Sequence, residues 1–315
     1  MVKILNRLML LAGMSAALIA CDATSVATVP ATLGEPVSIE TMLETAGSGP
    51  LVLKKHVMAR WSVPLSGLLN LEHPKVVAAG ITDRDEAIDI YSYSISHPDR
   101  GMFLVDSGIS ESFRSPADND ELSAIVKMGM NMQSLTLRRS TRELAQSLGG
   151  FNGVFLSHIH IDHIMGLTDL PAVTPVYIGS GDARMSSGLN LLTQGSTDRL
   201  LGVQAQLHEW QFGQTPVLDV FGDGTFFAIA SPGHTPGSTA YLAMTTEGPQ
   251  LMIGDATHTA WGWENGVEPG TFSADIPQSA VSLAMLKQLA DRIPMVVVHP
   301  GHQPLDKSAA STQEQ

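Results

Sequence analysis

The sequence has a single cysteine, Cys21, among its 315 residues. One cysteine excludes an intrachain disulfide framework and any metal site built on several thiolates, so histidine and carboxylate side chains must supply any metal ligands. Basic residues are also scarce, because 18 Lys and Arg stand against 31 Asp and Glu, a formal net charge of −13. Such an acidic surface repels polyanions, which argues against nucleic acid as a substrate or partner.

The sequence also lacks an apolar run that could cross a bilayer as a helix, which takes about 20 residues. The N-terminal apolar stretch, residues 8–20, is 13 residues long and follows Lys3 and Arg7, which is typical of a secretion signal. The sequence Leu18-Ile19-Ala20-Cys21 resembles the bacterial lipobox, whose cysteine becomes the lipid-modified first residue of the mature protein. The alternative is a signal peptide cut elsewhere, with an incidental Cys21. The lipobox reading implies a periplasmic or cell-envelope lipoprotein that contacts the membrane through this anchor only.

The rest of the chain has the composition of a globular protein, with 43% hydrophobic and 16% charged residues. We expect a signal peptide over 1–20, a flexible tether over 21–36, where no periodicity is visible, and a single domain over 37–315. Residues 88–97 and 102–106 flank Pro98-Asp99-Arg100-Gly101, which predicts a hairpin. Strand and helix patterns then alternate, with strands expected at 154–156, 175–178, 217–221, 225–230, 240–244, 251–253 and 295–298.

Two helices have recognisable ends. Ser140 and Glu143 fit a capping box at the start of a helix that Gly149 would end. Pro277 begins a second helix, whose apolar face continues to Arg292. These alternating elements indicate the α/β class.

The segment Ser157–His163 carries four side chains that can bind metal ions, directly after an apolar strand. They are His158, His160, Asp162 and His163. Four such groups in six residues are costly to bury in an apolar core unless something pairs with them. Imidazole nitrogen and carboxylate oxygen are the ligands that zinc accepts when thiolate is absent. The segment therefore predicts a metal site.

A His-x-His-x-Asp-His segment resembles the signature of the metallo-β-lactamase superfamily, and later pieces of the chain match that family in order. These pieces are the upstream strand end 104–108, the loop 231–238 around His234, the loop 253–256 around Asp255 and the C-terminal 298–302. The resemblance implies an αββα sandwich in which two mixed β-sheets are flanked by helices. It covers the chain from about residue 50 onward.

Carried over residue by residue, the resemblance implies two zinc ions, with other divalent metals as alternatives. His158, His160 and His234 would hold one ion, Asp162, His163 and His302 the other, and Asp255 would bridge them. Both His299 and His302 lie near the last position, and the family's terminal histidine usually follows Pro-Gly, as His302 does. Asp106 would orient a ligand histidine instead of binding metal; capping the turn before Gly108 is the alternative.

The family chemistry implies hydrolysis by a metal-bridging hydroxide. The pattern is most similar to quorum-quenching lactonases and organophosphate hydrolases, so a small ester, lactone or phosphotriester is the expected substrate. Asp162 and His258 are the expected catalytic residues. Acyl-homoserine lactonases usually have tyrosine where this chain has His258, three positions after Asp255. His258 would donate to an oxyanion or leaving group, or it is a loop residue facing water. Trp261 and Trp263 would wall the pocket or pack the loop.

Other members of the same family remain as alternatives. They are β-lactamases, thioesterases, and mononuclear iron enzymes that oxygenate persulfides. Periplasmic β-lactamases with this segment generally lack the bridging aspartate, so Asp255 argues against the first of these. Metal identity separates the iron enzymes from the hydrolases.

Overall fold

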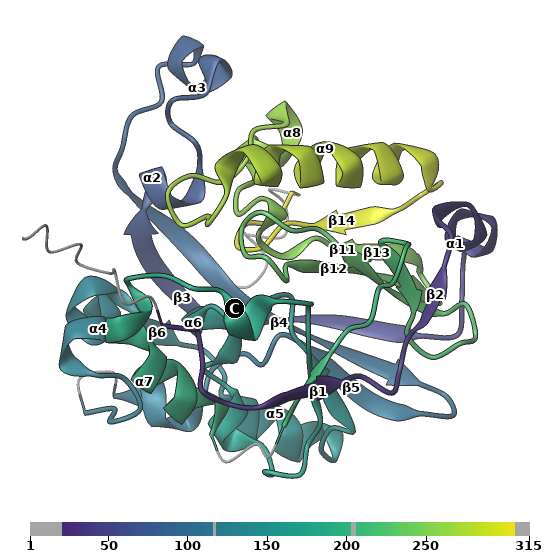
Figure 1. Cartoon of the computed structure of the whole chain (residues 1–315), viewed down its shortest axis with the longest axis horizontal. Helices are drawn as coiled ribbons and strands as arrows, with labels where there is room; N and C mark the ends of the chain where they lie inside the picture. The colour runs from purple at the N-terminus through teal and green to yellow at the C-terminus, as the bar shows by residue number, and fades with distance from the viewer. Residues whose placement is uncertain (1–20, 116–117, 203–205, 306–315) are drawn as a thin grey trace, which may run out of the picture.

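The computed structural model describes residues 21–115, 118–202 and 206–305. The predicted signal over 1–20 therefore lies outside the described residues. Two β-sheets lie face to face, and helices cover the outer face of each (Figure 1). This is the α/β sandwich, flanked by helices, that the sequence pattern implied. Among the described residues, no helix is both long and apolar enough to span a membrane.

The larger sheet contains parallel and antiparallel neighbours. Its order is β1 (Thr28–Pro30), β9 (Leu207–Glu209), β8 (Val176–Ile178), β7 (Gly153–Phe155), β5 (Gly101–Val105), β4 (Asp85–His97), β3 (Val52–Pro64) and β6 (Thr136–Leu137). The smaller sheet is also mixed. Its order is β14 (Val297–His299), β13 (Gly248–Met252), β12 (Thr239–Thr245), β11 (Phe226–Ala230), β10 (Val217–Asp219) and β2 (Glu35–Val37).

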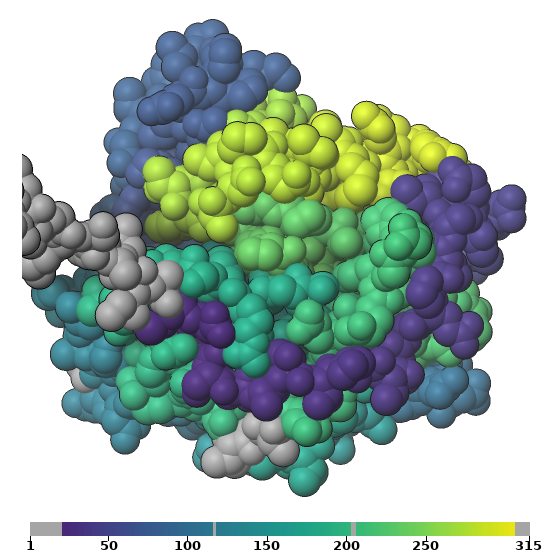
Figure 2. Space-filling view, viewed as in Figure 1, coloured from purple at the N-terminus to yellow at the C-terminus, as the bar shows by residue number. Residues whose placement is uncertain are grey.

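The helices divide between the two outer faces and the connections. They are α1 (Ile39–Thr45), α2 (Leu65–Leu68), α3 (Pro74–Ala78), α4 (Ala124–Gly129), α5 (Thr141–Leu148), α6 (Ile161–Ile164), α7 (Asn190–Leu201), α8 (Ala260–Asn265) and α9 (Ile276–Arg292). Figure 2 shows α9, in yellow, lying across the green strands of the smaller sheet. Leu286 and Leu289 of α9 pack with Leu242 and Leu251 of that sheet.

Aromatic side chains fill the space between the sheets. Phe155 of β7 stacks near Trp210 and lies 5.3 Å, ring centre to ring centre, from Phe226 of β11. The Tyr241 hydroxyl of β12 donates to the Leu156 carbonyl, 2.8 Å away, just after β7. Large rings buried on both inner faces make apolar burial the main force that joins the sheets. This packing fixes the ends of β7, β11 and β13 relative to one another.

Several local predictions are confirmed. Strands β4 and β5 pair antiparallel around the predicted turn, and Gly101 has the positive φ of 89° that such a turn favours. Helix α5 has the predicted capping box between Ser140 and Glu143 and ends at Gly149 with a φ of 84°. The helix predicted from Pro277 to Arg292 is α9.

The prediction of a flexible tether over 21–36 is wrong. Residues Thr28–Pro30 form β1 and pair with β9, while β2 pairs with β10, so this segment covers an edge of each sheet. Figure 2 shows it as a purple band along the surface. Exposed sheet edges leave N–H and C=O groups without partners, and the segment supplies partners to both edges. Short strands of three residues carry too little periodicity to be seen in the sequence.

The longest strand missed in the sequence is β3, at Val52–Pro64. Its polar residues Lys54, Lys55, His56 and Arg60 interrupt any regular alternation, and its register shifts between Val57 and Ala59. A β-bulge of this kind changes which face each following side chain occupies. The strand nonetheless pairs along its whole length with β4, which places Asp89 of β4 near the C-terminal loop.

Candidate metal centre

The His-x-His-x-Asp-His segment begins where β7 ends. Strand β7 is buried throughout, and the chain leaves it through a loop that carries His158 and His160. The single-turn helix α6 follows at once and presents Asp162 and His163 from its first turn. A short helix directly after a buried strand thus turns all four side chains toward one edge of the sandwich.

Three further loops reach the same edge from the smaller sheet and bring one ligand each. His234 follows β11, Asp255 lies in the 3-10 helix η5 (Gly254–Ala256) after β13, and His302 follows β14. The ends of strands from two packed sheets meet here, so residues spread over 145 positions converge. The structure brings together all seven residues that the family resemblance implied as ligands.

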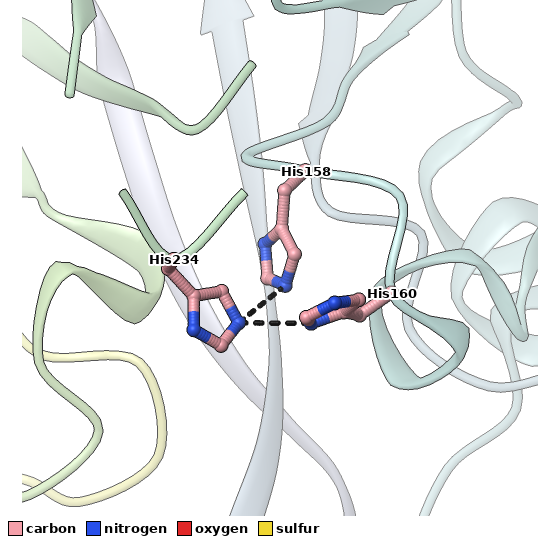
Figure 3. Close-up of side chains that lie close together, drawn as sticks. All are labelled: His158, His160 and His234. Carbon is pink, nitrogen blue, oxygen red and sulfur yellow. Dashed lines mark hydrogen bonds between the residues drawn. The ribbon is translucent and has the colours of Figure 1, made fainter. Parts of the chain in front are cut away.

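The first group consists of His158, His160 and His234 (Figure 3). Nε2 of His234 lies 3.2 Å from Nε2 of His158 and 2.8 Å from Nδ1 of His160. All three rings point their nitrogens at one spot. Burial lowers the pKa of His158 and of His234 well below the usual value, and it lowers the pKa of His160 to about 4. The three rings are therefore neutral near pH 7, the form that binds a metal ion.

The second group consists of Asp162, His163, Asp255 and His302. Oδ2 of Asp162 lies 3.6 Å from Nε2 of His163 and 3.4 Å from Nε2 of His302. Asp255 lies between the two groups, with Oδ2 3.4 Å from Nε2 of both His163 and His234 and Oδ1 3.3 Å from Nε2 of His302. The position of Asp255 suits a carboxylate that serves both groups.

Two atoms in this centre lack the partner that buried polar atoms normally have. Nε2 of His163 and Oδ1 of Asp255 are fully enclosed and make no hydrogen bond. Burying a polar atom without a hydrogen-bond partner costs up to several kcal/mol. In the native protein, these two atoms therefore need a partner such as a metal ion. Nitrogen and oxygen donors at these separations fit a borderline divalent cation such as zinc. The residues present therefore fit the metal that the fold implies.

Hydrogen bonds behind the ligands fix the direction of their rings. Nδ1 of His163 lies 2.9 Å from Oδ2 of Asp106, as the sequence had suggested for this carboxylate. Asp106 also accepts from the Ser157 backbone N–H at 2.7 Å, and it holds the left-handed φ of 55°. Burial alone would lower the pKa of His163, but Asp106 and the other nearby carboxylates outweigh it and raise that pKa well above its usual value.

The structure shows which of His299 and His302 lies with the ligand groups, and whether His258 faces water. His299 lies outside the metal group, with Nε2 2.8 Å from Oε1 of Gln250, so His302 is the histidine at the last position. His258 does not face water, because it is 1% exposed. Its Nε2 lies 3.1 Å from Oδ2 of Asp255, which makes it a neighbour of both predicted groups.

A buried carboxylate that the sequence did not single out links two of the ligand loops. Asp182 accepts the backbone N–H of Ile159, between His158 and His160, at 2.9 Å, and that of Gly237, after His234, at 3.0 Å. Burial raises the pKa of Asp182 to about 6, although these hydrogen bonds act against it. Its spacing in the sequence matches no ligand pattern, so only the three-dimensional contact identifies it.

A groove lies against Thr259 and Gln303, which directly follow His258 and His302 in the chain, and half of its lining residues are apolar. Trp261, Leu65, Leu69 and Ile81 line it, with Thr259, Arg84, Glu86 and Gln303 at its polar side. The other predicted wall residue, Trp263, packs against the smaller sheet's core, and Lys287 lies over its ring at 4.6 Å. Phe272 is 42% exposed and lies 6.5 Å from the His258 ring, centre to centre. Apolar side chains therefore lie near the predicted metal centre.

The fold and the ligand set define a metal-dependent α/β sandwich protein. The family model of the metallo-beta-lactamase superfamily matches residues 88–304, and the chain belongs to this superfamily. It is 31% identical over 155 residues to the N-acyl homoserine lactonase AttM of Azorhizobium caulinodans, which covers 48% of this chain and 57% of that protein. The chain thus matches little more than half the length of this relative.

Solved structures show the same fold at low sequence identity. A quorum-quenching N-acyl homoserine lactone lactonase superposes with a TM-score of 0.59 at 16% identity, covering 83% of this chain and 95% of the other. The dizinc quorum-quenching lactonase AidC, in complex with its product, gives a TM-score of 0.51 at 17% identity, covering 82% and 89%.

Proposed function

We propose that the protein is a dinuclear metal-dependent hydrolase that acts on a small, largely uncharged ester or lactone, with phosphotriesters as a related class. The observation that carries this proposal is the pair of ligand groups joined by Asp255, together with the unsatisfied Nε2 of His163 and Oδ1 of Asp255. Similarity to the lactonase AttM supports it.

When bound, the two ions lower the pKa of a water molecule toward neutrality and polarise the substrate carbonyl. The chain itself supplies binding, orientation and proton handling. His158, His160 and His234 would hold one ion and Asp162, His163 and His302 the other. Asp106 keeps the proton of His163 on Nδ1, so that Nε2 faces the centre.

Asp162 is the ligand best placed to handle a proton during turnover. Its side chain is 15% exposed, whereas those of His163, Asp255 and His302 are nearly enclosed. A partly exposed carboxylate can exchange protons with solvent. We assign Asp162 to accept a proton from the attacking water and return it to the leaving alkoxide.

The groove beside the centre favours an apolar substrate. Trp261, Leu65 and Leu69 offer ring and aliphatic surface in the groove, and the half-exposed ring of Phe272 packs over Gly67 of α2 nearby. The groove's cation, Arg84, already pairs with Glu86 at 2.8 Å, so it is a poor anchor for a substrate carboxylate. An acyl or aryl group fits these walls better than a charged one.

A substrate panel tests this proposal. Full-length protein loaded with zinc is assayed against acyl lactones, aryl esters, phosphotriesters and a β-lactam, with and without prior chelation. We expect metal-dependent turnover of at least one ester or lactone and weak turnover of the β-lactam. Turnover that survives complete metal removal, or a β-lactam as the best substrate, would contradict it.

We also propose that Cys21 carries a lipid and anchors the protein at the cell envelope. The Cys21 carbonyl accepts from the Asn190 side chain at 2.7 Å, so the start of the described chain lies at the N-terminus of α7. Helix α4 lies beside α7 (Figure 1), and exposed apolar side chains occur on both helices and at the residue before α7. They are Ile125, Met128, Leu189, Leu191 and Leu192. With no free tether, an acyl chain on Cys21 would hold this apolar surface against the bilayer.

Fractionation checks the anchor directly. In a bacterial host, wild-type protein should sediment with membranes, and the N-terminal peptide should carry the mass of acyl chains. Cys21→Ser should move the protein to the soluble fraction. An unmodified Cys21, or a membrane-bound Cys21→Ser protein, would refute the anchor without touching the proposed hydrolysis.

A further inference from the structure

The ring of His258 has a fixed orientation. Its Nδ1 lies 3.0 Å from the main-chain carbonyl oxygen of Leu68, in α2. A carbonyl oxygen only accepts hydrogen bonds, so Nδ1 carries the ring proton. Nε2 is therefore the nitrogen on the opposite side, and it is the one available to a metal ion.

That Nε2 faces the metal centre. It lies 3.1 Å from Oδ2 of Asp255, and the facing atoms of His234, Asp255 and His258 all lie within 4.8 Å of one another. A buried imidazole nitrogen opposite a carboxylate oxygen needs a positive charge between them, which either a proton on Nε2 or a bound cation supplies. His234 also belongs to the first group, so His258 lies beside one member of that group.

His258 repeats the arrangement of His302, one of the residues assigned to the second ion. Nδ1 of His302 lies 2.9 Å from the Asp89 carbonyl oxygen, and its Nε2 lies 3.3 Å from the other oxygen of Asp255, Oδ1. The two rings are nearly parallel, at 10°, with centres 5.5 Å apart. A ring whose Nδ1–H is fixed by a carbonyl and whose Nε2 points inward is the usual state of a metal-binding histidine.

We propose that His258 is a further metal ligand, which binds through Nε2 the ion held by His158, His160 and His234. This inference rests on the proposed function, because that function requires the ion. It replaces the expectation that His258 donates to an oxyanion or a leaving group, since Nδ1 is held by Leu68 and Nε2 would bind the ion. It also makes the first group richer in nitrogen than the second, which favours zinc, cobalt or nickel there over manganese.

Two substitutions separate the outward contact of His258 from its inward one. In His258→Asn, the amide N–H₂ takes the place of Nδ1 and keeps the bond to Leu68 but leaves nothing facing Asp255. In His258→Gln, the amide oxygen reaches the place of Nε2 and can face the ion, while the bond to Leu68 is lost. If His258 only supported α2 through its bond to Leu68, His258→Gln would reduce zinc affinity more than His258→Asn.

Zinc affinity of the full-length protein, measured by chelator competition, distinguishes these cases. We expect wild type to bind two ions and His258→Asn to bind one of them about 10- to 100-fold more weakly. His258→Gln should lose less affinity than His258→Asn. Unchanged binding of both ions by His258→Asn, or a greater loss in Gln than in Asn, would overturn the inference.

Nitrogen NMR of the histidine rings gives a second readout that does not depend on activity. On addition of zinc, Nε2 of His258 should shift while Nδ1 keeps its proton. A proton on Nε2 in the zinc-loaded protein would overturn the inference. If wild type itself binds no metal, the proposed function fails as well; if wild type binds two ions and turns over substrate while His258→Asn binds equally well, only the assignment of His258 fails.

Discussion

Oδ2 of Asp106 lies 2.9 Å from Nδ1 of His163, and this contact decides which nitrogen of His163 faces the metal centre. A carboxylate accepts only, so Nδ1 keeps its proton and Nε2 is the nitrogen turned toward the centre. The same carboxylate accepts from Ser157, the residue before His158. One buried side chain therefore positions the start of the ligand loop and the ring at its end.

Asp106→Asn should weaken the binding of the second ion by about 10- to 100-fold. The amide places an N–H₂ group against either His163 or the Ser157 N–H, so one of the two contacts is lost. Asparagine tolerates the left-handed backbone at this position, so the fold should survive. Zinc competition measures the affinity, and a melting curve of the zinc-free protein provides the control. Equal affinities for both ions in the variant and wild type would show that Asp106 does not orient His163.

Asp182→Ala should cost roughly 2–5 kcal/mol of unfolding free energy, because it leaves the N–H groups of Ile159 and Gly237 buried without an acceptor. It should also weaken zinc binding to the first group, since these N–H groups belong to its two ligand loops. Denaturant unfolding of the zinc-free protein and zinc competition measure the two effects.

Asp169 offers a matched control for Asp182. Its buried carboxylate accepts the backbone N–H groups of Glu111 at 2.8 Å and Arg142 at 2.9 Å, on segments that carry no predicted ligand. Asp169→Ala should lower stability and leave zinc affinity unchanged. If both variants weaken zinc binding equally, the effect of Asp182 is one of general stability and the positioning role is wrong.

His299 should make the protein less stable in mild acid. Burial, followed by the charge of Lys55, lowers the pKa of His299 to about 3. Because the unfolded chain takes up this proton near pH 6.5 and the folded one does not, stability is complete above pH 6.5 and falls as the pH drops toward 3. His299→Gln keeps a donor for Gln250 without the titration. Between pH 7 and 4 the free energy of unfolding of His299→Gln should fall by about 1–3 kcal/mol less than that of wild type. Denaturant unfolding of both proteins at the same zinc concentration measures this difference. Parallel pH curves would contradict this.

The proposed ligand set could be taken from the sequence through the family resemblance, because its members lie at strand ends and in short, recognisable segments. Ser157–His163 needs only the buried strand β7 before it, and the capping box of Ser140 is a local signal. The edge strands β1 and β2 were missed because their pairing partners, β9 and β10, lie about 180 residues later. A three-residue strand has no pattern of its own apart from that partner.

The surroundings of the metal centre were the harder part to predict. The ring orientation of His258 is fixed by a carbonyl 190 positions away in the sequence. Asp182 accepts hydrogen bonds from loops 23 and 55 positions away. The spacing of residues within a sequence motif cannot predict contacts over such distances. The family resemblance predicted which side chains converge at the centre, while the hydrogen bonds that orient them depend on how the two sheets pack.

A metal titration of hydrolytic activity tests the central claim most directly. Full-length protein is stripped by a chelator, checked by elemental analysis, and reloaded with zinc while hydrolysis of its best ester or lactone is followed. The proposal predicts no activity in the stripped protein and recovery that is complete only at two zinc ions per chain. Full activity without metal, or maximal activity with one iron per chain and uptake of oxygen, would contradict it.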